Sequence, residues 1–332
     1  MKDELNNTDA ELLLILQEGI PLEQKPFSII GKKIGISEEQ VIEKATFFIK
    51  RGMIRRFGAV FESHQLGYSS SLCAADIPSC DIERLVVAIT PHPGITHCYE
   101  RDGHPNLWLT MTAPEGELAA EIDKISRLLA PFELFNFPAL RTFKIGVVLD
   151  VRPEMQPAKP QLSESVRTTG ITMTAHKFND KERALIRILQ GNIPLSSPDP
   201  LEPVAKALGI GYEDLLSLLA EWKKNRIVRR FGFIPNHREI GFVVNAMCAW
   251  KVDPVKVEEA VRNLAKSPSV THCYERIANH VFPYNLFAMI HARTHDEALK
   301  IHDQLAAQAG LSDGRMMRSV REFKKSSPVF FA

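Results

Sequence analysis

Apolar residues near the start of the chain recur with the spacing of α-helices. The helical spacing i, i+4, i+7 and i+8 occurs, for example, at Val41, Ala45, Phe48 and Ile49. Ser37 with Gln40, and Thr8 with Glu11, have the spacing of capping boxes, so we expect helices to begin at these positions. A shorter helix is expected over residues 27–34. Together the three segments predict a helix-turn-helix.

Farther along, the spacing changes to the period of two that is typical of strands. We expect strands at 70–77, 107–112, 243–252 and 286–292, and helices at 82–90, 115–130, 254–267 and 295–310. With strands that begin at Thr96 and Thr271, and a last strand around Phe143 or Phe323, each half has the order βαββαβ. This order predicts a ferredoxin-like domain, in which helices cover one face of an antiparallel sheet.

The chain contains one unit twice. Arg-Arg-Phe-Gly at 55–58 recurs at 229–232, and Thr-His-Cys-Tyr-Glu-Arg at 96–101 recurs unchanged at 271–276. The offsets, 229 − 55 = 174 and 271 − 96 = 175, differ by one residue, which indicates a duplication. The predicted α+β fold is a tandem duplication with these parts: helix-turn-helix 1–60, ferredoxin-like domain 61–150, linker 151–177, second helix-turn-helix 178–234 and second ferredoxin-like domain 235–332.

Composition narrows the functional classes. With 332 residues, 45% of them hydrophobic and 24% charged, the chain is long enough for more than one domain and typical of globular proteins. The formal net charge of +1 provides no general attraction to nucleic acid or to an anionic membrane. The third helix of each helix-turn-helix begins with acidic residues, including Glu38, Glu39 and Glu213, which would meet phosphates with like charge. We therefore do not expect DNA binding.

Cysteine usage and hydropathy favour an intracellular compartment. The five cysteines include no CxxC pair, so we expect reduced thiols rather than disulfides or a cysteine zinc site. The apolar run 12–16 is short and flanked by acidic residues, so neither a signal peptide nor a membrane span is predicted. We expect a cytoplasmic protein.

The repeated strand segments gather chemical groups on one face of the predicted sheets. Alternation places together His97, Tyr99 and Arg101 in one copy, and His272, Tyr274 and Arg276 in the other. Arginine binds carboxylates in a bidentate manner, tyrosine donates a hydroxyl, and histidine can donate a proton near neutral pH. This set suits a large, flat, polyanionic ligand. The alternative interpretation is that these residues hold the two halves together at a pseudo-twofold interface.

Longer motifs resemble known families. The helix-turn-helix followed by a ferredoxin-like domain resembles the Lrp/AsnC regulators. The second half resembles the siroheme decarboxylases in five segments: 229–232, 236–241, 249–252, 272–276 and 283–291. The first half, with Pro-Asn-Leu-Trp-Leu-Thr at 105–110, resembles their partner subunit, called NirD or AhbA. The whole chain therefore resembles the fused NirDL type, which is related to the AhbA/AhbB pair.

The resemblance implies conversion of siroheme to 12,18-didecarboxysiroheme, with loss of carbon dioxide from two acetate side chains, for heme d1 or, by an alternative route, heme b. It implies no added cofactor and no resident metal, because the iron enters as part of siroheme. The expected partners are siroheme and its decarboxylated products, and the two halves are expected to pair within the chain, with further homo-oligomerisation left open. Two alternatives are retained: a ligand-responsive DNA-binding regulator of the Lrp/AsnC type, and a heme-binding carrier or sensor.

Differences between the halves rank the candidate residues. When the two halves are aligned, Thr112 takes the position of His291, and Ser63 takes that of His237. We therefore expect one working site centred on the second half. His64 lies one position later in its repeat than His237, which puts their equivalence in doubt. Four residues are predicted to be catalytic: His272, Tyr274, Arg276 and His291. Ten more are predicted to contact substrate: Arg55, His97, Arg101, Arg229, Arg230, His237, Trp250, Lys251, Tyr284 and Arg321. A histidine here would serve as general acid or as axial iron ligand.

Overall fold

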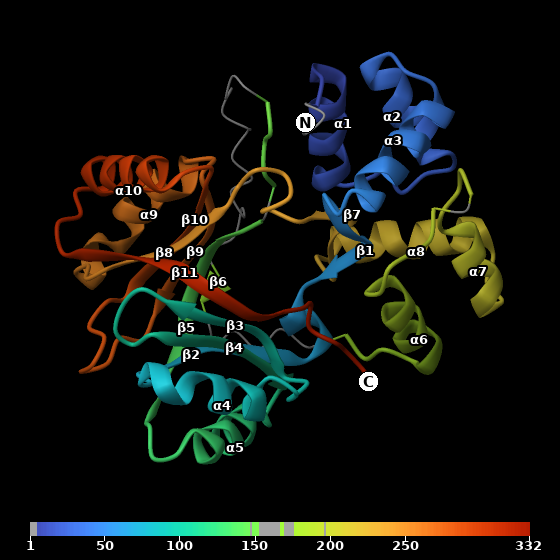
Figure 1. Ribbon diagram of the computed structural model, residues 1–332. Coiled ribbons are helices and arrows are strands. Elements are labelled where there is room, and N and C mark those ends of the chain that lie inside the picture. Colours follow the sequence, from blue (N-terminus) through green and yellow to red (C-terminus); the bar gives the residue numbers. More distant parts are fainter. Residues whose placement is uncertain (1–4, 147, 153–166, 169–175, 196) are drawn as a thin grey trace.

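The computed structural model describes residues 5–146, 148–152, 167–168, 176–195 and 197–332. Most of the predicted linker 151–177 lies outside these residues. Within the described residues, Figure 1 shows two groups of elements. Six helices surround a two-stranded ribbon in one group, and four helices accompany a larger assembly of strands in the other.

The first group contains two copies of a three-helix unit. Their helices are α1 (Asn7–Glu18), α2 (Pro26–Ile34) and α3 (Glu38–Lys50) in the first half, and α6 (Asp180–Leu189), α7 (Glu202–Leu208) and α8 (Tyr212–Lys224) in the second. Ser37 and Gln40 form the predicted capping box at α3. The predicted start of α1 is wrong, because Asn6 accepts a hydrogen bond from the Asp9 amide and the helix begins before Thr8.

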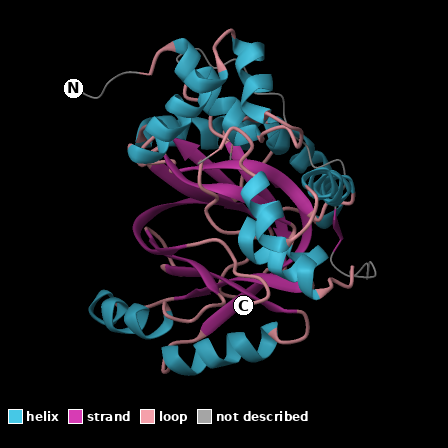
Figure 2. Cartoon of the chain, turned by 90° about the vertical axis from the view of Figure 1, so that its right-hand side faces the viewer, coloured by secondary structure: helices cyan, strands magenta, loops and turns pink. Residues whose placement is uncertain are grey.

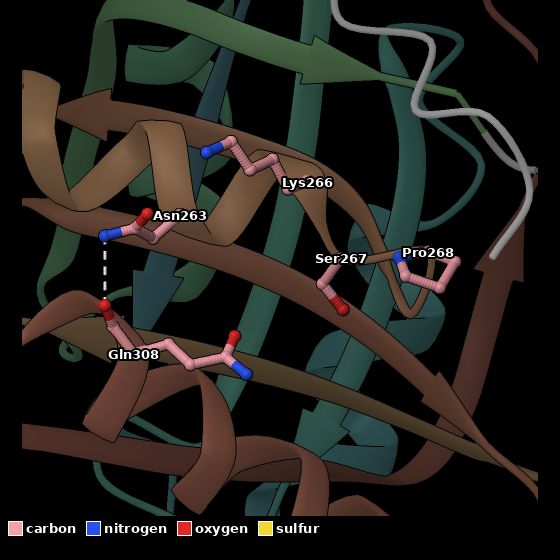
Figure 3. A pocket seen from close by; sticks show the side chains of 5 residues that line it. All are labelled: Asn263, Lys266, Ser267, Pro268 and Gln308. Carbon is pink, nitrogen blue, oxygen red and sulfur yellow. Dashed lines mark hydrogen bonds between the residues drawn. The ribbon is translucent and has the colours of Figure 1, made fainter.

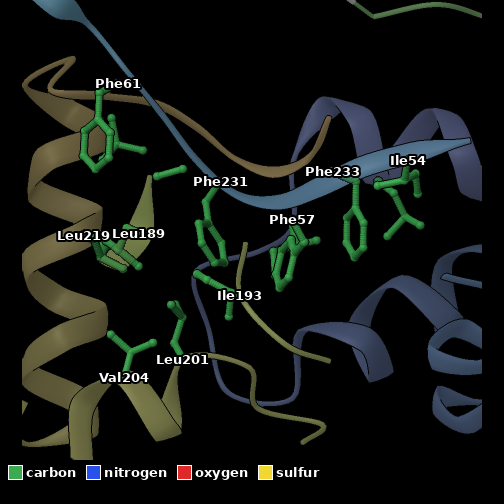
Figure 4. Close-up of a cluster of buried hydrophobic side chains, with 14 of the residues drawn as sticks. Ile54, Phe57, Phe61, Leu189, Ile193, Leu201, Val204, Leu219, Phe231 and Phe233 are labelled. Carbon is green, nitrogen blue, oxygen red and sulfur yellow. The ribbon is translucent and has the colours of Figure 1, made fainter. Parts of the chain in front are cut away.

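The Arg-Arg-Phe-Gly segments form strands that pair with each other, an element that the apolar pattern did not indicate. β1 (Ile54–Phe61) and β7 (Val228–Pro235) run antiparallel, with Phe57 opposite Phe233 and their rings stacked at 4.4 Å. α1 packs against β7, and Ile193, just after α6, donates its amide to the Phe57 carbonyl oxygen of β1 at 2.8 Å. One hydrophobic core therefore joins both three-helix units across the ribbon (Figure 4).

The glycines of both motifs lie where a helix end from the other half passes close by. A Cβ atom at Gly58 would lie 2.6 Å from the carbonyl oxygens of Leu189 and Gly191. One at Gly232 would lie 2.8 Å from the carbonyl oxygen of Leu16. A larger residue at either position would have to displace backbone, which a packed core resists. The glycines thus allow each three-helix unit to pack on the strand of the other half.

The second group contains two copies of the predicted order βαββαβ. The first comprises β2 (Tyr68–Ala75), α4 (Ser79–Ile89), β3 (Ile95–Arg101), β4 (Leu107–Pro114), α5 (Leu118–Leu129) and β5 (Leu134–Ile145). The second comprises β8 (Val244–Trp250), α9 (Val257–Lys266), β9 (Val270–Arg276), β10 (Leu286–Ala292), α10 (His295–Ala309) and β11 (Gly314–Lys325). The short elements are the 3-10 turns η1 (Ser63–Leu66) and η2 (Pro254–Lys256), and β6 (Arg167–Thr168), which pairs with β5.

The two sheets join through their last strands. In each copy the fourth strand pairs with the first, the first with the third, and the third with the second, all antiparallel. β5 and β11 each have 12 residues, and only their first parts pair with their own sheet, at β2 and β8. Their second parts pair with β9 and β3 of the opposite copy. The eight strands therefore form a closed ring of pairings.

Helices lie outside this ring (Figures 1 and 2). α4 and α5 pack on the first sheet, and α9 and α10 on the second. Cys98 and Cys273 are fully buried in these outer cores, which confirms that they are packed thiols. Between the sheets lies a third core, the inner apolar cluster, which includes Trp108, Phe137 and Phe287 from both copies. In the described part of the chain, every helix is too short or too polar to span a bilayer.

Lysines on the two long strands, β5 and β11, form hydrogen bonds between the two copies. Lys144 Nζ on β5 donates to the carbonyl oxygens of Ala265 (3.0 Å) and Ser267 (2.8 Å) at the C-terminus of α9. Lys324 Nζ on β11 donates to that of Thr90 (2.6 Å) at the end of α4. A cation at this position satisfies free carbonyl groups and interacts favourably with the helix dipole. Each long strand therefore caps a helix of the other copy.

Candidate functional site

Polar side chains collect at one end of the space between the two sheets. The inner apolar cluster fills the other end. The polar end contains four histidines that the sequence predicts as site residues: His97 of β3, His237 from the turn after β7, His272 of β9 and His291 of β10. They lie within electrostatic range of one another, since His97 and His291 both lower the pKa of His272, and His237 lowers the pKa of His291. We call this group the histidine cluster.

His237 and His291 are the most buried members of the histidine cluster. The two residues are 3% and 5% exposed, and their ring centroids are 5.1 Å apart. His291 Nε2 lies 3.3 Å from Asn245 Nδ2, and its Nδ1 lies 3.4 Å from the Thr271 hydroxyl. Within the described part of the chain, neither ring nitrogen of His237 has a hydrogen-bond partner. Protein groups therefore orient His291, whereas both nitrogens of His237 are available to a ligand.

A bulge in β9 brings Thr271 into the cluster. The pairing with β10 skips Thr271 between Val270 and His272, so strict alternation fails at this point. The Thr271 hydroxyl donates to the Met289 carbonyl oxygen at 3.2 Å and lies 3.1 Å from His272 Nδ1. Because its single proton goes to the carbonyl, the hydroxyl oxygen accepts from the Nδ1–H groups of His272 and His291. We therefore assign the lone pair of both imidazoles to Nε2.

Burial keeps the histidines neutral. It lowers the pKa of His97 to about 4 and that of His237 to about 3, and the positive charge of Lys325 adds to both effects. Burial also lowers the pKa of His272 to about 3 and that of His291 well below its ordinary value. Desolvation disfavours the charged imidazolium, so all four rings are uncharged near neutral pH. Among the described residues, no three His, Cys, Asp or Glu side chains converge as metal ligands.

Three cationic side chains surround one side of the histidine cluster. Lys325 on β11 lies opposite His97 in the strand pairing. Arg55 and Arg238 lower the pKa of both Lys325 and His237. Burial, followed by the charge of Arg55, lowers the pKa of Lys325 to about 8. None of the three cations forms an ion pair with a residue that the structure describes. This excess of positive charge suits a ligand with several carboxylates.

The equivalent groups on the other side are smaller. On β2 and β4, the hydroxyls of Ser70 and Thr112 are hydrogen-bonded at 2.8 Å. The same register position on β8 and β10 holds Asn245 and His291. His64 is exposed, in line with the doubt about its equivalence to a buried histidine. The ring thus contains two half-sites related by the repeat: one has His97 opposite Lys325, and the other has His272 opposite Ile145. The buried pair His237 and His291 belongs to the half-site of His97, because the charge of Lys325 lowers the pKa of both.

Two predicted site arginines have structural partners instead. Arg101 Nη1 donates to the Met317 carbonyl oxygen (3.1 Å), and Arg276 Nη1 donates to that of Phe137 (2.8 Å). Each guanidinium lies over the ring of the tyrosine two residues before it, at 5.4 and 4.6 Å. Both arginines therefore bind the backbone of the long strand from the other copy, and their predicted contacts with substrate and the catalytic role of Arg276 stay predictions.

Arg321 and Arg230 also bind protein groups. Arg321 forms ion pairs with Glu100 and Glu83 of the first half. Arg230 donates to the Gln17 carbonyl oxygen at the end of α1 (2.6 Å). Their charges thus hold one half of the chain against the other, and their predicted substrate contacts stay predictions.

Three other predicted contacts lie away from the histidine cluster. Trp250 is 1% exposed in the core beneath α10, where its ring stacks on His302 at 5.5 Å. Lys251 is exposed at the opposite end of β8 from Asn245. Tyr284 belongs to the inner apolar cluster. Sequence proximity to a motif does not fix the sheet face or strand end that a residue occupies, and the three predicted substrate contacts stay predictions that these positions do not favour.

The remaining predicted residues stay at the polar end: Arg55, His97, Arg229, His237, His272, Tyr274 and His291. Sequence reasoning missed Asn245, Thr271, Arg238 and Lys325. Comparison of the halves contains a signal for two of them, since Asn245 stands where the first half has Ser70 and Lys325 stands where it has Ile145. The bulge that admits Thr271 has no such signal.

A surface hollow lies elsewhere, outside the ring. It is lined by Asn263, Lys266, Ser267, Pro268 and Gln308, with the Asn263 amide donating to the Gln308 carbonyl oxygen at 2.9 Å (Figure 3). It shares no residue with the histidine cluster and has one cationic group among its lining residues. We therefore place the candidate site at the polar end of the ring.

Comparison with known proteins provides separate support. A profile described as the siroheme decarboxylase NirDL-like HTH domain matches residues 9–55 and 182–229, and one described as the AsnC-like ligand binding domain matches 65–144 and 239–324. The siroheme decarboxylase of Hydrogenobacter thermophilus is 32% identical over 332 residues, which cover 99% of this chain and 96% of that protein. The chain belongs to the siroheme decarboxylase family.

Solved structures agree with this assignment. A crystal structure of the siroheme decarboxylase NirDL matches with a TM-score of 0.72 and 27% identity, over 98% of this chain and 95% of that one. The same values hold for a crystal structure of NirDL in complex with an iron-uroporphyrin III analogue. The siroheme decarboxylase alpha subunit of Desulfovibrio desulfuricans is 35% identical over 43% of this chain and 83% of the subunit. The α+β fold thus consists of two repeats, each with a helix-turn-helix and an AsnC-like domain.

Proposed function

We propose that this chain decarboxylates siroheme to 12,18-didecarboxysiroheme in the biosynthesis of heme d1. The observation that carries the proposal is the cluster of neutral, desolvated histidines beside three cations without an ion-pair partner among the described residues. Siroheme is a flat tetrapyrrole with acetate and propionate carboxylates around its edge, which matches this set of groups. Membership of the family, and the likeness to NirDL in complex with an iron-uroporphyrin analogue, support the same ligand class.

The cations would anchor the substrate. Lys325, Arg55 and Arg238 would bind carboxylates at the edge of the macrocycle, and Arg229 lies close enough to His272 to lower its pKa. Hydrogen bonds between such charged groups are shorter and about twice as strong as neutral ones. Anchoring at several carboxylates fixes which acetate lies next to the histidines, and this positioning itself lowers the barrier.

Each decarboxylation consumes one proton. The bond between the acetate methylene carbon and the carboxylate carbon breaks, carbon dioxide leaves, and the electron pair stays on the methylene carbon, delocalised into the pyrrole. A proton then converts this carbon to a methyl group. We assign proton delivery to His237 and His291, with His237 facing the substrate and His291 held by Asn245 and Thr271. Substrate carboxylates raise the pKa of nearby imidazoles, because an opposite charge favours the protonated form.

The iron belongs to the substrate in this proposal, and no further cofactor enters it. His237 is the imidazole that we assign to the tetrapyrrole, since both of its nitrogens are available among the described groups. Loss of an axial ligand changes the absorption spectrum of a bound iron tetrapyrrole, whereas loss of an acid changes the rate. His237→Ala therefore separates the two roles.

Two finer statements belong to the proposal. We describe each four-stranded copy, over 61–150 and 235–332, as ferredoxin-like, on the strand order 4-1-3-2. We also propose that one chain is sufficient for activity, because the histidine cluster takes His97 from the first half and His237 and His291 from the second.

The test is anaerobic incubation of the purified chain with siroheme, followed by mass analysis of the tetrapyrrole. We expect the mass to fall by two molecules of carbon dioxide, and His291→Ala to abolish or strongly slow the change. An unchanged mass with a spectral shift would instead indicate a carrier or sensor. Tight, salt-dependent retardation of DNA would indicate a regulator, against which the acidic starts of α3 and α8 argue.

A further inference from the structure

The two half-sites are built alike, but their charges differ. Arg55 and Arg229 occupy the same repeat position, as do His97 and His272. The residue opposite each histidine on the long strand is not the same: β11 places Lys325 opposite His97, and β5 places Ile145 opposite His272. A cation next to the histidine is therefore present in one half-site and replaced by an aliphatic side chain in the other.

The remaining cation of the second half-site is also occupied by protein groups. Arg229 donates from Nη2 to the Ile145 carbonyl oxygen, and its Nε lies 4.0 Å from a carboxylate oxygen of Glu62. The repeat position of Glu62, seven residues after Arg55 (62 − 55 = 7), holds Asn236 in the second half (236 − 229 = 7). A carboxylate near Arg229 thus has an uncharged amide as its counterpart near Arg55.

Lys325 is in a different situation. Its side chain is partly buried. Burial and the charges of Arg55 and Arg238 disfavour the charged form of its amino group, and only Glu322 favours that form. No described residue forms an ion pair with it. A bound carboxylate would offset these positive charges. Because Lys325 is partly buried, its pairing with a carboxylate would be stronger than that of an ion pair fully exposed to solvent.

We propose that Lys325 binds a carboxylate of the tetrapyrrole and thereby directs one molecule of ligand to the half-site of His97, leaving the half-site of His272 without a second one. This inference rests on the proposed function for the identity of the ligand. It assigns to Lys325 a role in specificity and positioning rather than in proton transfer. The two half-sites then differ in ligand binding because of one position on each of the equivalent strands β11 and β5.

The test uses the full chain and a ligand whose binding does not depend on turnover, iron uroporphyrin. Absorption titrations would be made with wild type, Lys325→Met, Lys325→Arg and, as a control for loss of one surface charge, Lys300→Met on the exposed side of α10. We expect one molecule per wild-type chain, binding roughly ten- to a hundredfold weaker in Lys325→Met, and near-wild-type binding in the other two variants. Thermal melts would show that each variant is folded. With siroheme, Lys325→Met should raise KM more than it lowers kcat.

Several outcomes would overturn the assignment. They are two molecules per wild-type chain, unchanged affinity in Lys325→Met, equal weakening in Lys300→Met, or loss of kcat in Lys325→Met with affinity retained. Failure of the proposed function has a different signature. A wild-type chain that binds one iron uroporphyrin through Lys325, yet leaves the mass of siroheme unchanged, would support the role of Lys325 and refute decarboxylation.

Discussion

Lowering the pH from 7 to 5 should destabilise this protein through the pair His237 and His291. The folded-state pKa of His237 is about 3, and that of His291 is also well below its ordinary value of 6.5. Below pH 6.5 the unfolded chain therefore binds protons that the folded chain does not, so the free energy of unfolding falls as the pH falls. At pH 5, about 1.5 pH units below the unfolded pKa, the loss from His237 is about 2 kcal/mol, and His291 adds a loss of the same sign. For a stability of roughly 5–15 kcal/mol this is a large fraction.

Urea unfolding at pH 7, 6 and 5, followed by far-UV circular dichroism, would measure this loss. His237→Gln removes one of the four histidines whose pKa is lowered by burial, so its stability should fall by about 2 kcal/mol less between pH 7 and 5 than that of the wild type. His64→Gln is the matched control, because His64 occupies the corresponding turn of the first half but is exposed. Equal unfolding free energies of the wild type at pH 7 and 5, or the same pH dependence in His237→Gln, would refute the reasoning.

Three further predictions concern the site and the ring. His237→Ala and His291→Ala should each slow siroheme decarboxylation by about 10²–10⁴-fold, measured by product mass over time, and a wild-type rate in either would remove that residue from proton delivery. Lys251→Met should keep the wild-type rate, because Lys251 lies at the far end of β8, and a tenfold loss would restore it to the site. Gly232→Ala should lower the free energy of unfolding by about 1–3 kcal/mol, since its Cβ would lie 2.8 Å from the Leu16 carbonyl oxygen, while Gly146→Ala, with nothing within 4 Å, should not.

Local elements could be predicted from the sequence because their signals are local. The capping box of Ser37 and Gln40, the period of two along Leu107–Pro114 and the order βαββαβ depend on residues a few positions apart. The repeat also predicted correctly that Cys98 and Cys273 are packed thiols. In these cases, propensity, pattern and tertiary packing favour the same structure.

Long-range pairing could not be predicted in the same way. The pattern of β5 and β11 indicates a strand, but it does not show that the second part of each crosses to the other copy. For this reason Arg101, Arg276 and Arg321 were expected to bind a ligand, although their partners are groups of the opposite half. The bulge at Thr271 has a related cause, because it depends on the register with Met289 rather than on the residue itself.

The exchange of β5 and β11 has a consequence for how the fused chain assembles. Each sheet is completed by a strand of the other copy, and Lys144 and Lys324 cap helices across the same boundary. Two separate subunits with this design would have to meet by diffusion, so their assembly would weaken on dilution. Joining the halves in one chain replaces that encounter with an effective concentration set by the covalent connection. Formation of the histidine cluster in this chain therefore does not depend on protein concentration.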